Sequence, residues 1–254
     1  AKSGYKEIIL IAQDTTKYGI DIYGKPKLAE LLKKLCKIDG IKWIRFLYAY
    51  PETIDDKLIK VVKKNEKICK YFDIPIQHIS DSVLKRMNRK SNSESIELLI
   101  KKLREKIPNV IIRTTVMVGF PGETQEDFEK LCNFVESAKF DKLGAFAYSK
   151  EEGTPAAKLK EQVHPMTKKA RYNKIMEIQQ KVSEENLNKY IGKQLEVLVE
   201  GKTIDGKYYV CRSYMDVPDI DGLIYLNNSK ELKIGDFVKC TIKSSINEYD
   251  LLGE

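Results

Sequence analysis

The sequence predicts an α/β protein: a partial (βα) barrel followed by a small all-β domain. Over about the first 150 residues, apolar runs of strand length alternate with amphipathic helical segments, the pattern of βαβ units with parallel strands. No GxGxxG pattern follows the first strand, which favours a barrel over a doubly wound sheet. After Gly192 the chain changes to short strands separated by "DG", "DIDG" and "KIGD" turns.

Five strand regions are expected in the α/β part. Each of the first four is followed by a helical region, and the third is followed by two. The strands are expected at 7–13, 43–49, 71–77, 109–119 and 142–149, and the helical segments at 27–37, 55–69, 80–87, 93–106 and 124–138.

The domain organisation follows from these patterns. We expect the partial barrel at 1–160, a connecting segment with a long helix (about 168–190) at 161–191, and the all-β domain at 192–254. The opening "AKSGYKEIILIA" reads as the tail of a helix that leads into a strand. The sequence therefore predicts a fragment that begins inside a barrel.

Charge is spread unevenly along the chain. The net charge is +8, but residues 192–254 carry 8 Lys+Arg against 11 Asp+Glu, which is −3, and the first 191 residues carry 37 against 26, which is +11. A basic body is typical of proteins with an anionic partner, and it is equally typical of solvated lysine-rich helices, so both interpretations stay open. The acidic C-terminal part argues against nucleic acid as its own target.

The five cysteines do not form a metal-binding motif. The nearest pair, Cys211 and Cys240, is 29 positions apart, so no CxxC or CxxxCxxC group exists. We expect reduced thiols packed in the core of a cytoplasmic protein, because no signal peptide and no apolar run of membrane-spanning length is present.

Polar and aromatic residues follow the predicted strands. In parallel α/β barrels ligands bind at the carboxyl ends of the strands, so these residues predict a site there, although loop polarity alone would produce part of the pattern. The strand ends are Gln13-Asp14, Tyr48 to Pro51, Gln77-His78, Gly119 to Gly122, and Tyr148-Ser149.

The strand at 109–119 carries an arginine on its inner face. Its alternate residues from Val110 to Val118 are apolar or β-branched, so Arg113 on the other face points into the barrel. A buried guanidinium needs an anionic ligand or an internal carboxylate, and the sequence leaves both open. Gly119 offers bare backbone to a flat ligand or serves only the turn, and Thr124 with Asp127 predicts a capping box.

Five motifs then occur in a characteristic order. They are "LYAYPETI" (47–54), "DIPIQHISDSVLKRMNR" (73–89), "RTTVMVGFPGETQEDFEKL" (113–131), "FAYSKEEGTPAA" (146–157) and "CRSYMDVPDIDGLIYL" (211–226). Together they resemble the radical S-adenosylmethionine (SAM) methylthiotransferases along almost the whole chain. "DIPIQHISD" and "DVPDIDG" resemble the RimO-like branch, which modifies an aspartate of a small-subunit ribosomal protein, more than the tRNA-modifying branch.

This resemblance implies an enzyme of three parts. An N-terminal domain holds one 4Fe–4S cluster on three cysteines, a TIM-like radical SAM barrel holds a second on CxxxCxxC, and the C-terminal β-barrel is a TRAM domain. The sequence departs from this pattern because it has neither set of cysteines and matches from the second barrel strand onward. We therefore expect no catalytic residue and no metal ligand in this chain, and no turnover by these 254 residues alone.

The resemblance also implies part of a SAM site. Arg113 and Gln77 are expected to hold the polar end of the cofactor, with Gln13 and Tyr48 as further candidates. Val118, Gly119 and Phe120 are expected to line the adenine pocket, and His78 is given no role.

The implied function is β-methylthiolation of an aspartate in a basic ribosomal protein. The acidic TRAM domain would bind this protein, and an electron donor would serve the two clusters. The alternatives are tRNA methylthiolation and an inert fragment that only binds substrate. A barrel hydrolase or aldolase without iron is a further class, but it needs a nucleophile–base pair or a strand-end lysine, and Lys150 reads better as a solvated loop residue.

Overall fold

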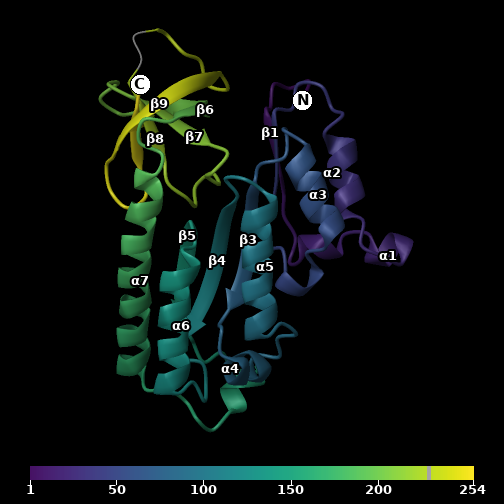
Figure 1. The fold of residues 1–254 in the computed structure, drawn as a ribbon, viewed down its shortest axis with the longest axis vertical. Coiled ribbons are helices and arrows are strands. Elements are labelled where there is room, and N and C mark those ends of the chain that lie inside the picture. Colours follow the sequence, from purple (N-terminus) through teal and green to yellow (C-terminus); the bar gives the residue numbers. More distant parts are fainter. Residues whose placement is uncertain (228–229) are drawn as a thin grey trace.

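The computed structural model describes residues 1–227 and 230–254 (Figure 1). An α/β part with helices outside its strands makes up most of the molecule, and a small β-barrel lies at one end of it. No helix within these two ranges is long and apolar enough to cross a membrane.

The α/β part contains two parallel sheets with the strands in sequential order. Their strands are β1 (Glu7–Leu10) and β2 (Trp43–Phe46) in one sheet, and β3 (Tyr71–Gln77), β4 (Ile111–Val118) and β5 (Lys142–Ala147) in the other. The sheets meet where the Cys69 N–H donates to the Ile44 carbonyl (3.0 Å) and the Ala49 N–H to the Asp73 carbonyl (2.8 Å). The predicted partial (βα) barrel is confirmed.

Helices lie along the outside of the α/β part (Figure 1). They are α1 (Ile20–Tyr23), α2 (Leu28–Leu35), α3 (Asp56–Lys64), α4 (Asp81–Arg86), α5 (Ser93–Lys106), α6 (Gln125–Ala138) and α7 (Pro165–Asn188), with 3-10 turns at Thr15–Lys17, Pro51–Thr53 and Ala156–Lys158. The predicted capping box at α6 is confirmed, since Thr124 and Asp127 bond each other's backbone N–H groups.

Two kinds of predicted boundary were wrong. α3 ends at Lys64 rather than at Cys69, because Asn65 takes an extended backbone and its side chain donates to the Val61 carbonyl (2.7 Å). β1, β2 and β5 end two or three residues early. In β2 the reason is Tyr48, whose φ of 57° cannot continue a strand.

β4 has the two faces that its sequence predicts. Ile112, Thr114, Val116 and Val118 are fully buried under the outer helices, and the Thr114 hydroxyl donates to the Ile74 carbonyl (2.7 Å). Arg113 lies on the opposite face and lines the interior of the partial barrel. The inward placement of Arg113 is therefore confirmed.

The long helix α7 joins the two parts and packs along β5 and α6. The side-chain amides of Gln179 and Asn186 both donate to the Phe140 carbonyl, at 3.0 and 3.3 Å. These bonds fix the helix at the point where the chain enters β5.

The C-terminal part is a closed β-barrel with the order β10-β8-β7-β6-β9, as the all-β prediction required. Its strands are β6 (Gln194–Lys202), β7 (Tyr209–Ser213), β8 (Ile224–Leu226), β9 (Phe237–Ser245) and β10 (Leu251–Gly253). Sequence patterns missed β10, which has only three residues. Gly253 is needed there because a Cβ would lie 2.1 Å from the Cys240 sulfur.

This β-barrel is docked on the amino-terminal ends of the parallel strands (Figure 1). Its segment 211–221 forms ionic and polar contacts with inner-face residues, among them Arg212 with Glu7 (2.7 Å), Lys142 with Asp216 (3.0 Å), and the Tyr71 hydroxyl with Asp221 (2.7 Å). A shared apolar core also includes Trp43 and Met215. The domain therefore closes one end of the partial barrel.

The docking changes the charge that the C-terminal domain offers to solvent. Arg212, Asp216 and Asp221 face the α/β part and are buried or nearly so. Without them, residues 192–254 carry 7 Lys against 9 Asp+Glu, so the solvent-facing balance is −2 rather than −3. The domain still presents more acidic than basic residues to solvent, but the difference is smaller than the sequence indicates.

Candidate functional site

A cavity of about 580 Å³ lies at the carboxyl ends of the parallel strands, away from the C-terminal domain. All five strand regions contribute to it. Four residues predicted from the sequence come together in its wall: Gln13, Tyr48, Gln77 and Arg113. Its further lining residues include Ile11, Pro75, Thr115, Phe146, Tyr50 and Arg89.

Two of these residues hold a left-handed backbone. Tyr48 has φ 57° and Gln77 φ 70°, a conformation that costs residues other than glycine about 1–2 kcal/mol. Tyr48 is held there because its N–H donates to an Asp73 carboxylate oxygen (3.1 Å) and its carbonyl accepts from the Thr15 N–H (3.1 Å). Such conformations are typical of binding and catalytic sites.

Asp73 organises the polar side of the cavity, and sequence reasoning missed it. Its side chain is 1% exposed, with Oδ2 bound to the Tyr48 N–H and Oδ1 to Nη1 of Arg113 (2.9 Å). The sequence did contain a signal: Asp73 is an even number of positions from Tyr71 and Gln77 on β3, so the three side chains are expected on the same, inner face. Asp73 is also the direct register partner of Arg113.

Arg113 has a second carboxylate beside it. Oδ1 of Asp221 lies 3.7 Å from the Arg113 Nε. Burial alone would lower the pKa of Arg113, but its interactions with Asp73, Tyr71 and Asp221 outweigh burial and raise that pKa. Of the two partners left open by the sequence, the internal carboxylate is therefore present. Contact between Arg113 and a ligand stays a prediction, favoured by its place in the cavity wall.

The backbone N–H groups of the "GFPGE" turn after β4 are bonded within the turn. The N–H groups of Gly119 and Phe120 both donate to Oε2 of Glu123, whose other oxygen pairs with Arg171 (3.1 Å). Gly119 has φ +72°, and a Cβ there would lie 2.4 Å from Cγ of Lys168. Packing of Lys168 on the bare backbone therefore explains this glycine without a ligand.

The three predicted adenine-side residues do not line the cavity. Val118 is buried on the outer face of β4, Gly119 lies under Lys168, and the Phe120 ring packs edge-on against Tyr148, with centroids 5.2 Å apart. Contact of these residues with adenine stays a prediction.

His78 follows Gln77 and is fully buried. Its Nδ1 accepts the Ser80 N–H at 2.9 Å, and burial lowers the pKa of the imidazole to about 4. The ring is therefore neutral near pH 7 and is built into the turn that leads to α4.

Because of His78, the free energy of unfolding should decrease as the pH is lowered. Its pKa drops from an ordinary 6.5 to about 4 on folding, so the unfolded chain binds the proton more tightly in that range. The contribution of His78 to the free energy of unfolding is complete above pH 6.5. It decreases by on the order of 3 kcal/mol as the pH falls to about 4. Urea denaturation of wild type and His78→Asn at several pH values measures this: the variant should show the smaller slope between pH 6.5 and 4, and equal slopes would contradict the assignment.

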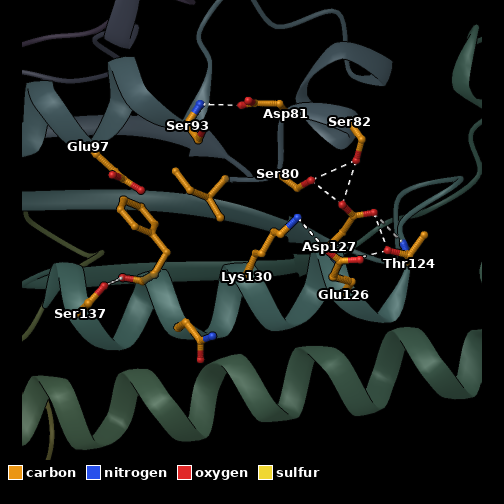
Figure 2. A pocket seen from close by; sticks show the side chains of 13 residues that line it. Ser80, Asp81, Ser82, Ser93, Glu97, Thr124, Glu126, Asp127, Lys130 and Ser137 are labelled. Atoms are coloured by element: carbon orange, nitrogen blue, oxygen red, sulfur yellow. Dashed lines mark hydrogen bonds and ion pairs between the residues drawn. The ribbon is translucent and has the colours of Figure 1, made fainter.

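A larger cavity, of about 840 Å³, lies on the outer surface between α5 and α6 (Figure 2). Its central carboxylate, Asp127, accepts hydrogen bonds from Ser80, Ser82 and Thr124. Burial works to raise the pKa of Asp127, but these hydrogen bonds lower it overall. Figure 2 shows these side chains directed at one another, so they join the start of α4 to the start of α6.

Cys69, Cys211 and Cys240 are buried core residues, and Cys36 and Cys132 are half-buried beside the core. Burial raises the pKa of Cys69 and Cys240 to about 11 and that of Cys211 to about 12, which keeps these thiols protonated. Among the described residues no group of three or more His, Cys, Asp and Glu side chains is placed to hold a metal ion. An iron–sulfur cluster therefore does not fit the described side chains.

Comparison with known families gives the context of this cavity. Residues 1–135 match the radical SAM superfamily, and residues 191–254 match the TRAM domain. The chain belongs to the radical SAM superfamily. The radical SAM match covers the strands that supply the cavity up to β4, and the TRAM match coincides with the docked β-barrel.

Curated relatives define the branch. The chain is 62% identical over 255 residues to a protein of Alkaliphilus oremlandii and 56% identical over 254 residues to one of Thermoanaerobacter sp.. Both are named ribosomal protein uS12 methylthiotransferase RimO. The alignments cover 100% of this chain but 58% and 57% of those proteins, so the chain spans little more than half of their length. The predicted resemblance of this radical SAM chain to the RimO-like proteins is therefore confirmed.

Proposed function

We propose that this chain is the part of a radical SAM methylthiotransferase that binds SAM and the protein substrate. The full-length enzyme would add a methylthio group to the β-carbon of an aspartate in ribosomal protein uS12. The observation that carries this proposal is the 62% identity, over the whole chain, to a relative named for that activity. We keep the division into barrel (1–160), connecting segment (161–191) and TRAM domain (192–254).

The strand-end cavity is the proposed SAM site. Arg113, Gln77 and Gln13 supply charge and amides for an amino-acid end, and Ile11, Pro75 and Phe146 supply apolar surface for a flat ring. SAM held at a 4Fe–4S cluster is the source of radical chemistry in this superfamily. The role of these residues is to bind and orient the cofactor. Two such clusters belong to the proposal, but no residue of this chain is assigned to either.

The partner proposal rests on charge. The solvent-facing residues of the TRAM domain carry the net −2 derived above, which suits a lysine- and arginine-rich ribosomal protein better than a phosphate backbone. An electron donor and a cytoplasmic location complete the proposal. Because segment 211–221 is used in docking, the substrate would approach the opposite surface of the domain or the mouth of the cavity.

The proposed function and its alternatives differ in the molecule that receives the methylthio group. We expect the full-length holoenzyme, given SAM and a reductant, to methylthiolate uS12 at an aspartate and to leave bulk tRNA from the same cells unmodified. Mass spectrometry of both acceptors after the same reaction measures this. Modification of tRNA alone would contradict the proposal in favour of tRNA methylthiolation, and modification of neither would favour an inert substrate-binding fragment.

A further inference from the structure

The strand-end cavity has a basic wall. Two guanidinium groups, those of Arg89 and Arg113, line it, and no carboxylate is among its lining residues in the described part of the chain. A ligand that fills such a cavity gains from carrying an anionic group. The two arginines differ in how much of their charge is already compensated.

Arg113 is largely neutralised from within the protein. Asp73 pairs with its Nη1 at 2.9 Å and Asp221 lies 3.7 Å from its Nε. Arg89, in contrast, forms no ion pair with any residue of 1–227 or 230–254. The uncompensated positive charge of the cavity therefore belongs to Arg89.

The position of Arg89 is fixed by local structure. α4 is followed by Asn88 with φ 57°, a left-handed conformation that asparagine adopts more readily than most residues. The Arg89 N–H donates to the Leu84 carbonyl (2.9 Å), and its Cζ lies 5.1 Å from the centroid of the Tyr50 ring. A guanidinium over an aromatic face keeps its in-plane N–H groups available, and these match a carboxylate in two parallel hydrogen bonds.

Two carboxylates belong to the proposed reaction. One is on the methionyl end of SAM, and the other is the side chain of the acceptor aspartate. Arg89 comes from the α4–α5 connection rather than from a strand, and Tyr48 and Phe146 in the same cavity wall are exposed. Arg113 lies near the start of β4 and reaches Asp221 of the domain that closes the opposite end, so it lies deeper. A side chain presented by a folded protein would therefore meet Arg89 first.

We propose that Arg89, oriented by Tyr50, binds the carboxylate of the acceptor aspartate and so selects aspartate as the residue to be modified. This inference rests on the proposed function and adds to it the group that recognises the acceptor. Asparagine has nearly the same shape but no charge, so it is the natural probe of this contact.

The test measures binding in the full-length holoenzyme with SAM present and reductant omitted, so that no turnover occurs. The ligands are uS12 and its variant with asparagine at the acceptor position. The enzymes are wild type, Arg89→Gln, and Lys90→Gln, which removes an equal charge from the adjacent exposed residue. SAM affinity is measured for each enzyme in parallel and also shows that the variant is folded.

We expect wild type and Lys90→Gln to prefer the aspartate form of uS12 by roughly 10- to 100-fold, the range for a lost charge-assisted contact. Arg89→Gln should lose that preference and keep its affinity for SAM. If Arg89→Gln kept the preference and bound SAM more weakly, the guanidinium would serve the cofactor carboxylate and the inference would be overturned. An unchanged preference and unchanged SAM affinity would overturn it as well. Failure of wild type to bind either form of uS12 would overturn the proposed function itself, and the inference with it.

Discussion

Replacing Glu7 by alanine is expected to lower the free energy of unfolding by about 3–5 kcal/mol. Glu7 lies on β1 and its two carboxylate oxygens serve two buried cations: Nε of Arg45 at 2.9 Å and Nη2 of Arg212 at 2.7 Å. The Arg45 side chain is 0% exposed and that of Arg212 is 3% exposed. Without Glu7, Arg45 keeps only the Tyr214 carbonyl as a described hydrogen-bond acceptor, which does not neutralise its charge.

The same substitution should loosen the contact between the two domains. Arg212 belongs to the TRAM domain, so Glu7 joins that domain to the first strand of the partial barrel. The only tryptophan of the chain, Trp43, lies in the shared core with its ring edge-on to Phe237, centroids 4.8 Å apart. Its fluorescence during urea denaturation therefore reports both the global stability and the interface.

A matched control is Glu126→Ala. Glu126 also pairs with a cation, Lys130 at 2.9 Å, but both side chains are more than half exposed. Its loss should change the unfolding free energy by no more than about 0.5 kcal/mol, as is usual for surface pairs. Equal midpoint shifts for the two variants would show that the Glu7 network does not hold the domains together.

The fold was largely predictable from local patterns. The period-two alternation of β4 placed Arg113 inside, and the capping box Thr124/Asp127 marked the start of α6 within one residue. Both features depend on neighbours within a few positions, which is the range over which sequence patterns carry information. The polar strand ends likewise identified four residues that meet in one cavity.

The charge network was not predictable, because it joins residues far apart in the chain. Asp221 bonds Tyr71 across 150 positions, and Arg212 bonds Glu7 across 205. "DVPDIDG" was recognisable only as a family motif, and its physical role in closing the barrel requires the docked arrangement of the two domains. The same holds for Glu123, which occupies the backbone N–H groups of Gly119 and Phe120.

Replacing Arg113 by alanine should weaken SAM binding by the full-length holoenzyme by roughly 10-fold or more. The guanidinium is the fixed cation of the inner wall, and its raised pKa keeps it charged near neutral pH. Alanine would also leave Asp73 without its cationic partner. Since Asp73 holds the Tyr48 N–H, the effect should extend to the shape of the cavity.

Companion variants separate charge from shape. Arg113→Lys keeps a cation but not the planar fork, so we expect an intermediate loss of affinity. Gln77→Asn shortens a second cavity residue and tolerates the left-handed backbone at φ 70°, so it should also weaken binding while preserving the fold. Lys130→Gln, on the outer surface, should bind SAM as wild type does.

The dissociation constant of SAM for these enzymes is the most direct test that the strand-end cavity is the cofactor site. Isothermal titration of the anaerobic full-length holoenzyme should give weaker binding for Arg113→Ala and Gln77→Asn, an intermediate value for Arg113→Lys, and the wild-type value for Lys130→Gln. Wild-type affinity in both Arg113→Ala and Gln77→Asn, with all proteins folded, would contradict the account and place the cofactor elsewhere.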